Sequence, residues 1–274
     1  MIRLLLRLLY KAGRKDGEND MHMRTKKWAK PELSACPYYA EEPTAYKGIW
    51  RTKFDRDQPL YVELGCGKGV STAQMVHEQQ DRNFVAVDIT SNVLGDARRN
   101  IERLYDGMPV RNVILSRFDI SRFDEYFGQD DRIERIYINF CNPWTKRPKY
   151  AKRRLTHTRQ LMQYRHALAP QGEIWFKTDD DTLFDESLPC FEESGFETVL
   201  VIRDLAESDF TPNYISEHEQ MYRDLGVPIK FLIARMHPLD AVGQARHDAV
   251  IEEVSRREKN ERQRKAAHGD EHMP

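Results

Sequence analysis

The 274-residue sequence lacks the residue patterns of metal sites, disulfide frameworks and membrane spans. Its nine histidines are scattered and its cysteines form no CxxC pair, so we expect no metal and predict reduced thiols in a cytoplasmic protein. No apolar run approaches the ~18 residues that cross a bilayer, so we expect no membrane partner. The four cysteines are Cys36, Cys66, Cys141 and Cys190.

An excess of charge of one sign is also absent. The formal net charge of −1 gives no indication of a polyanionic partner. Basic residues are nevertheless concentrated locally, and the local electrostatic field matters more for binding than the net charge. With 40% hydrophobic and 32% charged residues, the composition is globular, and the length suits one domain with tails. No feature demands an obligatory protein partner, and we expect a monomer or a homodimer.

The two ends of the chain differ from its middle. Residues 1–10, MIRLLLRLLY, are followed by no small-residue cleavage site, which argues against a signal peptide. We expect residues 1–22 to be a dispensable extension, with an amphipathic helix on a membrane or a partner as the alternative. Residues 23–237 form the expected domain, and residues 238–274 form a charged tail, either helical or disordered.

Between residues 60 and 236, segments typical of strands and helices alternate. This order predicts a single α/β domain with a mostly parallel, seven-stranded sheet and helices on both faces. Ligands bind at the carboxyl ends of the strands in such sheets. Before this region, residues 24–50 are interrupted by prolines and predict an irregular arm, which either packs over a sheet edge or touches RNA. The expected strands are 60–64, 83–89, 110–115, 133–140, 172–179, 197–205 and 228–236, and the expected helices are 71–79, 91–105, 156–168, 182–193 and part of 213–225.

A glycine-rich turn follows the first of these strands. Gly65, Gly67 and Gly69 come directly after it and directly before a predicted helix, which lets a backbone approach a ligand at a helix N-terminus. Asp88 ends the next strand about 20 residues later, where an acidic side chain can accept hydrogen bonds from ribose hydroxyls. The pattern therefore predicts a nucleoside-cofactor site.

Glu63, on the strand before this turn, indicates which cofactor binds. Residues 63–69 have the pattern ExGxGxG, whereas dinucleotide-binding folds have GxGxxG. A carboxylate here can accept from the amine of S-adenosylmethionine, whereas it would repel the pyrophosphate of NAD. We therefore expect a Rossmann-like, class I S-adenosylmethionine-dependent methyltransferase and disfavour an NAD-dependent oxidoreductase.

Acidic residues also follow two later strands, and for each group we consider two roles. Asp119 either caps a short helix or contacts the adenine amino group of the cofactor. Asp179, Asp180 and Asp181 more often form a helix cap than a metal site.

The stretch IYINFCNPWTKRPKYAKRRL, residues 136–155, combines a buried strand, a polar turn at Asn142-Pro143 and a run without acidic residues. A strand that ends in such a turn is where α/β enzymes place reacting groups, and the basic run suits a polyanion. The basic residues are Lys146, Arg147, Lys149, Lys152, Arg153 and Arg154.

Taken together, the motifs resemble those of the bacterial tRNA (guanine-N(7)-)-methyltransferase family, the TrmB type, over about residues 23–236. The glycine turn is generic to methyltransferases, whereas the order NPW, KRRL and KTD is specific. The matching segments are RTKKWAKPEL (24–33), VELGCGKG (62–69), NFCNPWTK (139–146), KRRLTH (152–157), FKTDDDTLF (176–184), ISEHE (215–219) and LGVPI (225–229).

The resemblance implies methyl transfer to guanosine 46 in the variable loop of tRNA. It implies an S-adenosylmethionine pocket lined by Glu63, Gly65, Gly67, Asp88, Asp119 and Asn142. It also implies tRNA contacts from Lys146, Asp179, Ser216, Glu217, His218 and Glu219, and the basic run Arg147, Lys149, Lys152, Arg153 and Arg154 suits the tRNA backbone.

The sequence departs from the family at several positions, of which Asn142 is the most important. The family usually has aspartate there, and Ser216 and His218 replace the usual threonine and aromatic residue. Because guanine nitrogen 7 already carries a lone pair, we expect Asn142 to orient the guanine or the cofactor instead of acting as a general base. Three alternatives stay open: a methyltransferase for another RNA, one for a protein or small molecule, and a tRNA-binding protein without catalysis.

Overall fold

The structure is a computed structural model, and it describes residues 25–145 and 148–269. The expected extension 1–22, Lys146 and Arg147, and the last five residues of the tail lie outside the described residues. Among the helices that the structure describes, none is long and apolar enough to cross a membrane.

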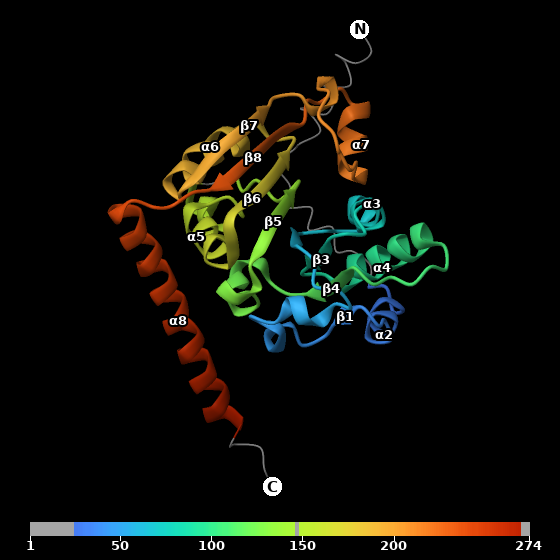
Figure 1. The fold of residues 1–274 in the computed structure, drawn as a ribbon, viewed down its shortest axis with the longest axis horizontal. Helices are drawn as coiled ribbons and strands as arrows, with labels where there is room; N and C mark the ends of the chain where they lie inside the picture. The colour runs from blue at the N-terminus through green and yellow to red at the C-terminus, as the bar shows by residue number, and fades with distance from the viewer. Residues whose placement is uncertain (1–24, 146–147, 270–274) are drawn as a thin grey trace.

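One eight-stranded sheet organises the molecule, in the order β1-β4-β3-β2-β5-β6-β8-β7 (Figure 1). The strands from β1 to β6 run parallel, and β8 is antiparallel to both β6 and β7. The mostly parallel sheet is therefore confirmed, whereas the predicted number of seven strands is wrong by one. The strands are β1 (Tyr39–Ala40), β2 (Leu60–Leu64), β3 (Asn83–Asp88), β4 (Val113–Arg117), β5 (Ile133–Asn139), β6 (Leu168–Thr178), β7 (Phe196–Ile202) and β8 (Lys230–Met236).

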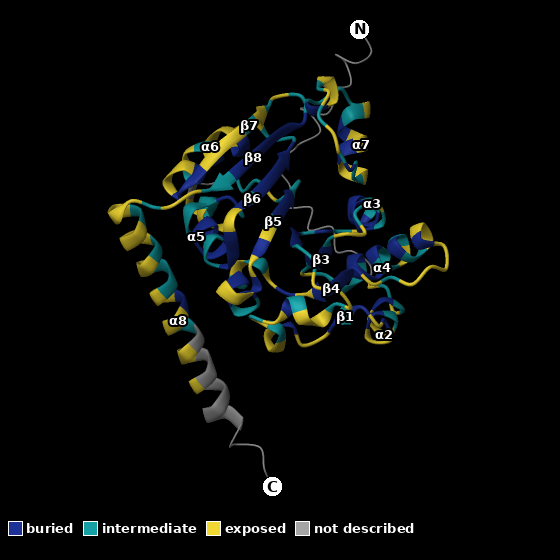
Figure 2. Ribbon diagram, in the orientation of Figure 1, coloured by how far each residue is buried: buried dark blue, intermediate teal, exposed yellow. Residues whose placement is uncertain are grey.

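Helices cover both faces of the sheet, because the central strands are apolar on both sides. Leu60, Val62 and Leu64 of β2 pack with α5 and α6, while Tyr61 packs with α2, α3 and α4. All five residues of β2 are buried, as expected for a central parallel strand, and so are most residues of its neighbours β3 and β5 (Figure 2). The helices are α2 (Ala29–Ser34), α3 (Val70–Glu78), α4 (Ser91–Tyr105), α5 (Thr158–Ala167), α6 (Asp181–Glu193), α7 (Glu217–Asp224) and α8 (Ala241–Gly269).

The described part of the 24–50 segment packs over the sheet edge, as one of the two alternatives predicted. Its strand β1 pairs with β4, and α2 lies against α4. A Cβ atom on Gly95 of α4 would lie 2.9 Å from the Cβ of Ala29, so glycine permits this close approach. Trp50 is fully buried, and its indole N–H donates to the carbonyl oxygen of Tyr126 at 2.7 Å.

The charged tail is helical over α8, which leaves the sheet beyond β8 and extends from the domain (Figure 1). Side chains near the middle of α8 hold the helix to the domain. Val254 is buried, Glu253 pairs with Arg159 at 2.9 Å, and Arg257 pairs with the buried Asp124 at 3.0 Å.

Candidate cofactor and substrate site

The candidate site lies at the carboxyl ends of β2, β3 and β5. After β2 the chain builds β3 and β4 on one side, and it later returns to build β5 and β6 on the other. A sheet of this kind is open at the strand where the order reverses, which is where ligands bind. The predicted glycine turn, Asp88 and the Asn142 turn all emerge at this end of the sheet.

The glycine turn has the conformation that a ligand-binding backbone needs. Gly65, Gly67 and Gly69 have φ values of 83°, 55° and 66°, in the left-handed region that favours glycine. At Gly69 a Cβ atom would lie 2.6 Å from the Cβ of Ala97, so this glycine also lets α3 and α4 pack together. At Gly65 and Gly67 no atom lies within 4 Å of an added Cβ, so the turn borders open space.

Asp88 supports this turn from the neighbouring strand. Its carboxylate accepts from the backbone N–H of Gly67 at 3.1 Å and from that of Thr90 at 2.9 Å. Burial raises the pKa of Asp88, while these two N–H donors act in the opposite direction. The half-buried carboxylate thus lies beside the turn at which the sequence predicted ribose binding.

Glu63 lies below the turn and is only 2% exposed. The hydroxyls of Thr72 and Ser71 and the side-chain amide of Asn139 donate to its carboxylate, the last at 3.1 Å. Burial raises the pKa of Glu63, and the three donors oppose that shift. Glu63 therefore links α3 to the end of β5. Sequence reasoning missed Asn139, whose position at a strand end three residues before Asn142 was the available signal.

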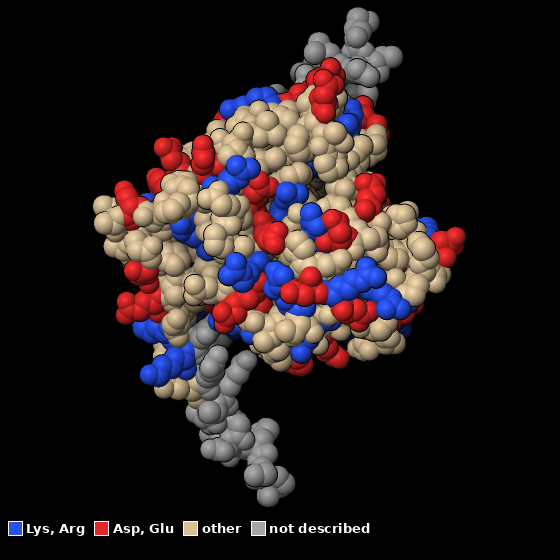
Figure 3. Space-filling view, viewed as in Figure 1, with Lys and Arg blue, Asp and Glu red and all other residues tan. Residues whose placement is uncertain are grey.

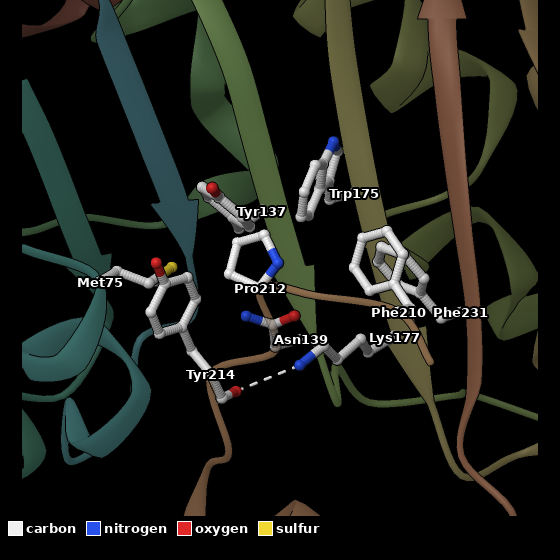
Figure 4. A pocket seen from close by; sticks show the side chains of 9 residues that line it. All are labelled: Met75, Tyr137, Asn139, Trp175, Lys177, Phe210, Pro212, Tyr214 and Phe231. Carbon is white, nitrogen blue, oxygen red and sulfur yellow. Dashed lines mark hydrogen bonds between the residues drawn. The ribbon is translucent and has the colours of Figure 1, made fainter. Parts of the chain in front are cut away.

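A second buried polar cluster joins β6 to the segment before α7. The ammonium of Lys177, 7% exposed, donates to the carbonyl oxygen of Tyr214 at 3.1 Å and pairs with Glu219 at 3.0 Å. Glu219 is fully buried and also accepts from Asn213 and Arg223. Figure 4 shows Lys177 beside Asn139, with Tyr214 facing them across a small pocket. Burial lowers the pKa of Lys177, and its pairing with Glu219 opposes this.

The Asn142 turn is held by the side-chain oxygen of Asn142 and by Arg154. The exposed Asn142 accepts from the backbone N–H of Trp144 at 3.1 Å, and Trp144 has a φ of 46°. Arg154 donates to the carbonyl oxygen of Pro143 at 2.9 Å and pairs with Glu186 of α6. Because Arg154 is only 8% exposed, the structure places it under the turn and away from the surface where a tRNA backbone would lie.

Other residues of the basic run are on the surface. Lys149, Lys152 and Arg153 are exposed, and the guanidinium of Arg153 lies 5.1 Å from the ring centroid of Trp144. On the face drawn in Figure 3, basic and acidic side chains are interspersed and not segregated into one large basic field. Lys146 and Arg147 remain sequence predictions.

In the segment 216–219, some side chains point into the protein and others are exposed to solvent. The hydroxyl of Ser216 accepts from the backbone N–H of Glu219 at 3.1 Å and caps α7, and Glu219 points into the interior. Glu217 pairs with Lys68 of the glycine turn at 2.8 Å, and His218 is exposed. Of the four residues of this segment that the resemblance assigned to tRNA, Glu217 and His218 are therefore those with exposed side chains.

Two of the four acidic residues, Asp119 and Asp180, act as helix caps. Asp119 accepts from the backbone N–H of Ser121 at 2.9 Å, and Asp180 accepts from that of Leu183 at 2.7 Å. Asp181 pairs with Lys230, whose ammonium also donates to the carbonyl oxygen of Asp179. Within the described ranges, no group of three or more acidic, His or Cys side chains is arranged to hold a metal ion.

This fold and this site define a Rossmann-like class I methyltransferase. The open glycine turn, the half-buried carboxylate of Asp88 and the exposed Asp119 at the end of β4 fit a nucleoside cofactor, and S-adenosylmethionine is the methyl donor of this class. A family model described as "Putative methyltransferase" matches residues 57–232. The chain belongs to the bacterial tRNA (guanine-N(7)-)-methyltransferase family.

Two relatives and one solved structure illustrate these similarities. The tRNA (guanine-N(7)-)-methyltransferase of Clostridium botulinum (strain Eklund 17B / Type B) is 48% identical over 216 residues, which are 78% of this chain and 98% of the relative. That of Ruminiclostridium cellulolyticum is 45% identical over 243 residues, 88% of this chain and 100% of the relative. The crystal structure of the 16S rRNA methyltransferase KamB covers 79% of this chain and 96% of its own, with 8% identity and a TM-score of 0.50, and is similar in fold alone.

Proposed function

We propose that this protein transfers the methyl group of S-adenosylmethionine to ring nitrogen 7 of guanosine 46 in the variable loop of tRNA. The observation that carries the proposal is the identity of 45–48% with tRNA (guanine-N(7)-)-methyltransferases over nearly their whole length. The family model matches residues 57–232, a range that includes the glycine turn and the Asn142 turn. We infer action in the cytoplasm, as a monomer or homodimer without an obligatory protein partner.

Methyl transfer to guanine nitrogen 7 mainly requires that the guanine and the methyl group are correctly positioned. S-adenosylmethionine supplies an activated methyl group, and guanine nitrogen 7 already presents a lone pair, so no residue has to remove a proton first. The glycine turn and Asp88 would hold the nucleoside part of the cofactor, Glu63 would fix the floor beneath it, and Asp119 would meet the adenine. Asn142 would orient the guanine or the cofactor through its amide group.

The tRNA would lie over the neighbouring surface. Lys149, Lys152 and Arg153 are exposed beside the Asn142 turn and can neutralise phosphates. Lys146, Asp179 and residues 216–218 retain the contacts that the resemblance implies, and Arg147 retains its expected place on the tRNA backbone. For Arg154 and Glu219, whose side chains are buried, we infer an indirect contribution, through the turn and through α7.

A second candidate is a tRNA-binding protein of the same fold with little or no catalysis. The observation that favours it is Asn142, which lacks the negative charge usual at this position. Intact Glu63, glycine turn and Asp88 argue for retained cofactor binding, and therefore for the enzyme.

One assay separates these candidates. The purified protein is incubated with methyl-labelled S-adenosylmethionine and bulk tRNA that lacks 7-methylguanosine, and the tRNA is digested to nucleosides. We expect the label in 7-methylguanosine over many turnovers. Label in another nucleoside would contradict the proposed reaction, and cofactor and tRNA binding without any label would favour the second candidate.

A further inference from the structure

Three aromatic rings gather where β5 ends and α7 begins. The ring centroid of Phe140 lies 6.3 Å from that of Tyr222, with an interplanar angle of 22°, and 5.9 Å from that of His218. The centroids of His218 and Tyr222 are 5.3 Å apart. Tyr222 is buried, Phe140 is half-buried and His218 is exposed, so the cluster has a buried floor and an open side.

Phe140 has an unusual backbone conformation for a bulky residue. Its φ is 53°, in the left-handed region, a backbone conformation that residues other than glycine rarely adopt. Its backbone N–H donates to the carbonyl oxygen of Lys177 at 2.9 Å, which holds this conformation. Strained residues of this kind cluster at functional sites. In the sequence Phe140 directly follows Asn139, which contacts Glu63, and its ring lies against His218 and Tyr222.

The other side of the cluster is fixed by α7. Glu219 anchors this helix in the interior through Lys177 and Arg223, and Glu217 ties its first turn to Lys68 of the glycine turn. Figure 1 shows α7 beyond the carboxyl ends of β5 and β6 and next to α3. The ion pairs of the buried Glu219 therefore hold α7, and with it His218 and Tyr222, in place.

We propose that Phe140 and His218 form the surface on which the target guanine of the RNA stacks during methyl transfer. This inference rests on the proposed function and adds residues to it. A flat purine is recognised by aromatic side chains that hold it at one orientation. The cluster lies on the β5 side of β2, whereas the predicted ribose and adenine contacts, Asp88 and Asp119, lie on the β3 and β4 side. The cofactor therefore leaves the β5 side free, and we expect the substrate purine to bind there.

The reaction gives the aromatic ring a further role. The lone pair of guanine nitrogen 7 forms the new bond to the methyl carbon, the bond between that carbon and sulfur breaks, and its electron pair stays on sulfur. Sulfur loses its positive charge and guanine gains it, without a proton transfer. Aromatic faces attract cations, so stacking on Phe140 strengthens as the charge develops and acts on kcat as well as on KM.

The test compares the variants Phe140→Leu and Phe140→Tyr. We expect Phe140→Leu, which keeps apolar bulk without an aromatic ring, to lower kcat/KM for tRNA by about ten-fold or more, partly through kcat. Phe140→Tyr retains the ring and should stay within about two-fold of the wild type. His218→Ala should lower kcat/KM for tRNA, and His218→Phe should restore it. The Kd for S-adenosylmethionine should not change in any of these variants.

A matched control variant and measurements of folding accompany these substitutions. Phe54→Leu makes the same change at a half-buried ring near the β1 edge and should leave all constants unaltered. Thermal unfolding and cofactor binding show whether each variant is folded. A weaker Kd for S-adenosylmethionine in Phe140→Leu, with an unchanged KM for tRNA, would mean that the rings stack the adenine of the cofactor. Unchanged constants in both Phe140→Leu and His218→Ala would also overturn the proposal. Failure of the proposed function would instead appear as no 7-methylguanosine from the wild type.

Discussion

Asn142 is the single residue on which turnover depends most in this account. Its side-chain oxygen accepts from the N–H of Trp144 and holds the turn. We predict that Asn142→Ala lowers kcat by about ten-fold or more, because the turn loses its acceptor and the reacting groups lose an orienting amide. Asn142→Asp keeps the acceptor and adds a negative charge near the developing charge on guanine, so it should raise kcat by a few-fold. Steady-state kinetics check both variants, and full turnover by Asn142→Ala would refute the orienting role.

Glu63 should make the stability of the protein depend on pH. Burial raises its pKa in the folded state above the ordinary value of 4.5, so the folded state binds this proton more tightly than the unfolded state. The stabilisation from this group is therefore complete below that value and is lost as the pH rises through the folded-state pKa. In the variant Glu63→Gln, the side chain at this position has no ionisable group.

We predict that the free energy of unfolding of the wild type, minus that of Glu63→Gln, falls as the pH rises above 4.5. The slope should be at most about 1.4 kcal/mol per pH unit. Urea unfolding across the acidic range measures it, and a difference that rises with pH would contradict the assignment.

At the scale of residues, the sequence predicts local chemistry better than it predicts partners. Gly65, Gly67 and Asp88 could be placed together because parallel strand ends share one edge. The contact between Glu63 and Asn139 could not be predicted, since it joins positions 76 residues apart. Likewise, Arg154 looks like its basic neighbours in the sequence, and only its pairing with Glu186 across the fold shows that it is buried.

The helix α7 depends on a buried ion pair. Glu219 has no exposed surface and meets both Lys177 and Arg223, so its loss leaves the buried ammonium of Lys177 without a counter-charge. We predict that Glu219→Gln lowers the free energy of unfolding by about 2–4 kcal/mol. The neighbouring Glu217→Gln, whose carboxylate is exposed in its pair with Lys68, should cost less than about 1 kcal/mol. Urea denaturation compares the two, and equal effects would show that Glu219 does not anchor the helix.

At the scale of elements, apolar periodicity predicted the strands and helices from residue 60 to 236, with shifts at their ends. The strand expected at 110–115 is β4, Val113–Arg117, because Asn112 is held by the carbonyl oxygens of Val76 and Gln79 and ends the preceding loop. Strand β1 was missed. It has only two residues, and its pairing with β4 is a tertiary contact without a periodic pattern.

For the molecule as a whole, we predict how tRNA binding depends on salt. Lys152 and Arg153 are exposed beside the Asn142 turn, and each phosphate contact releases counterions. Replacing both with alanine should weaken tRNA binding and reduce the slope of log K against log salt by about 1–2. Arg256 and Lys259 of α8 are also exposed, so their double alanine variant matches the change in net charge. An equal loss of slope in this control would show that binding follows total charge and not the surface beside the turn.

The location of the methyl group on tRNA tests the central claim most directly. The purified protein and S-adenosylmethionine are incubated with an unmodified tRNA transcript and with the same transcript carrying adenosine at position 46, and chains are cleaved at 7-methylguanosine. We predict one cleavage in the variable loop, at position 46, in the first transcript and no cleavage in the second. Cleavage at other guanosines, or equal methylation of both transcripts, would contradict the proposed function.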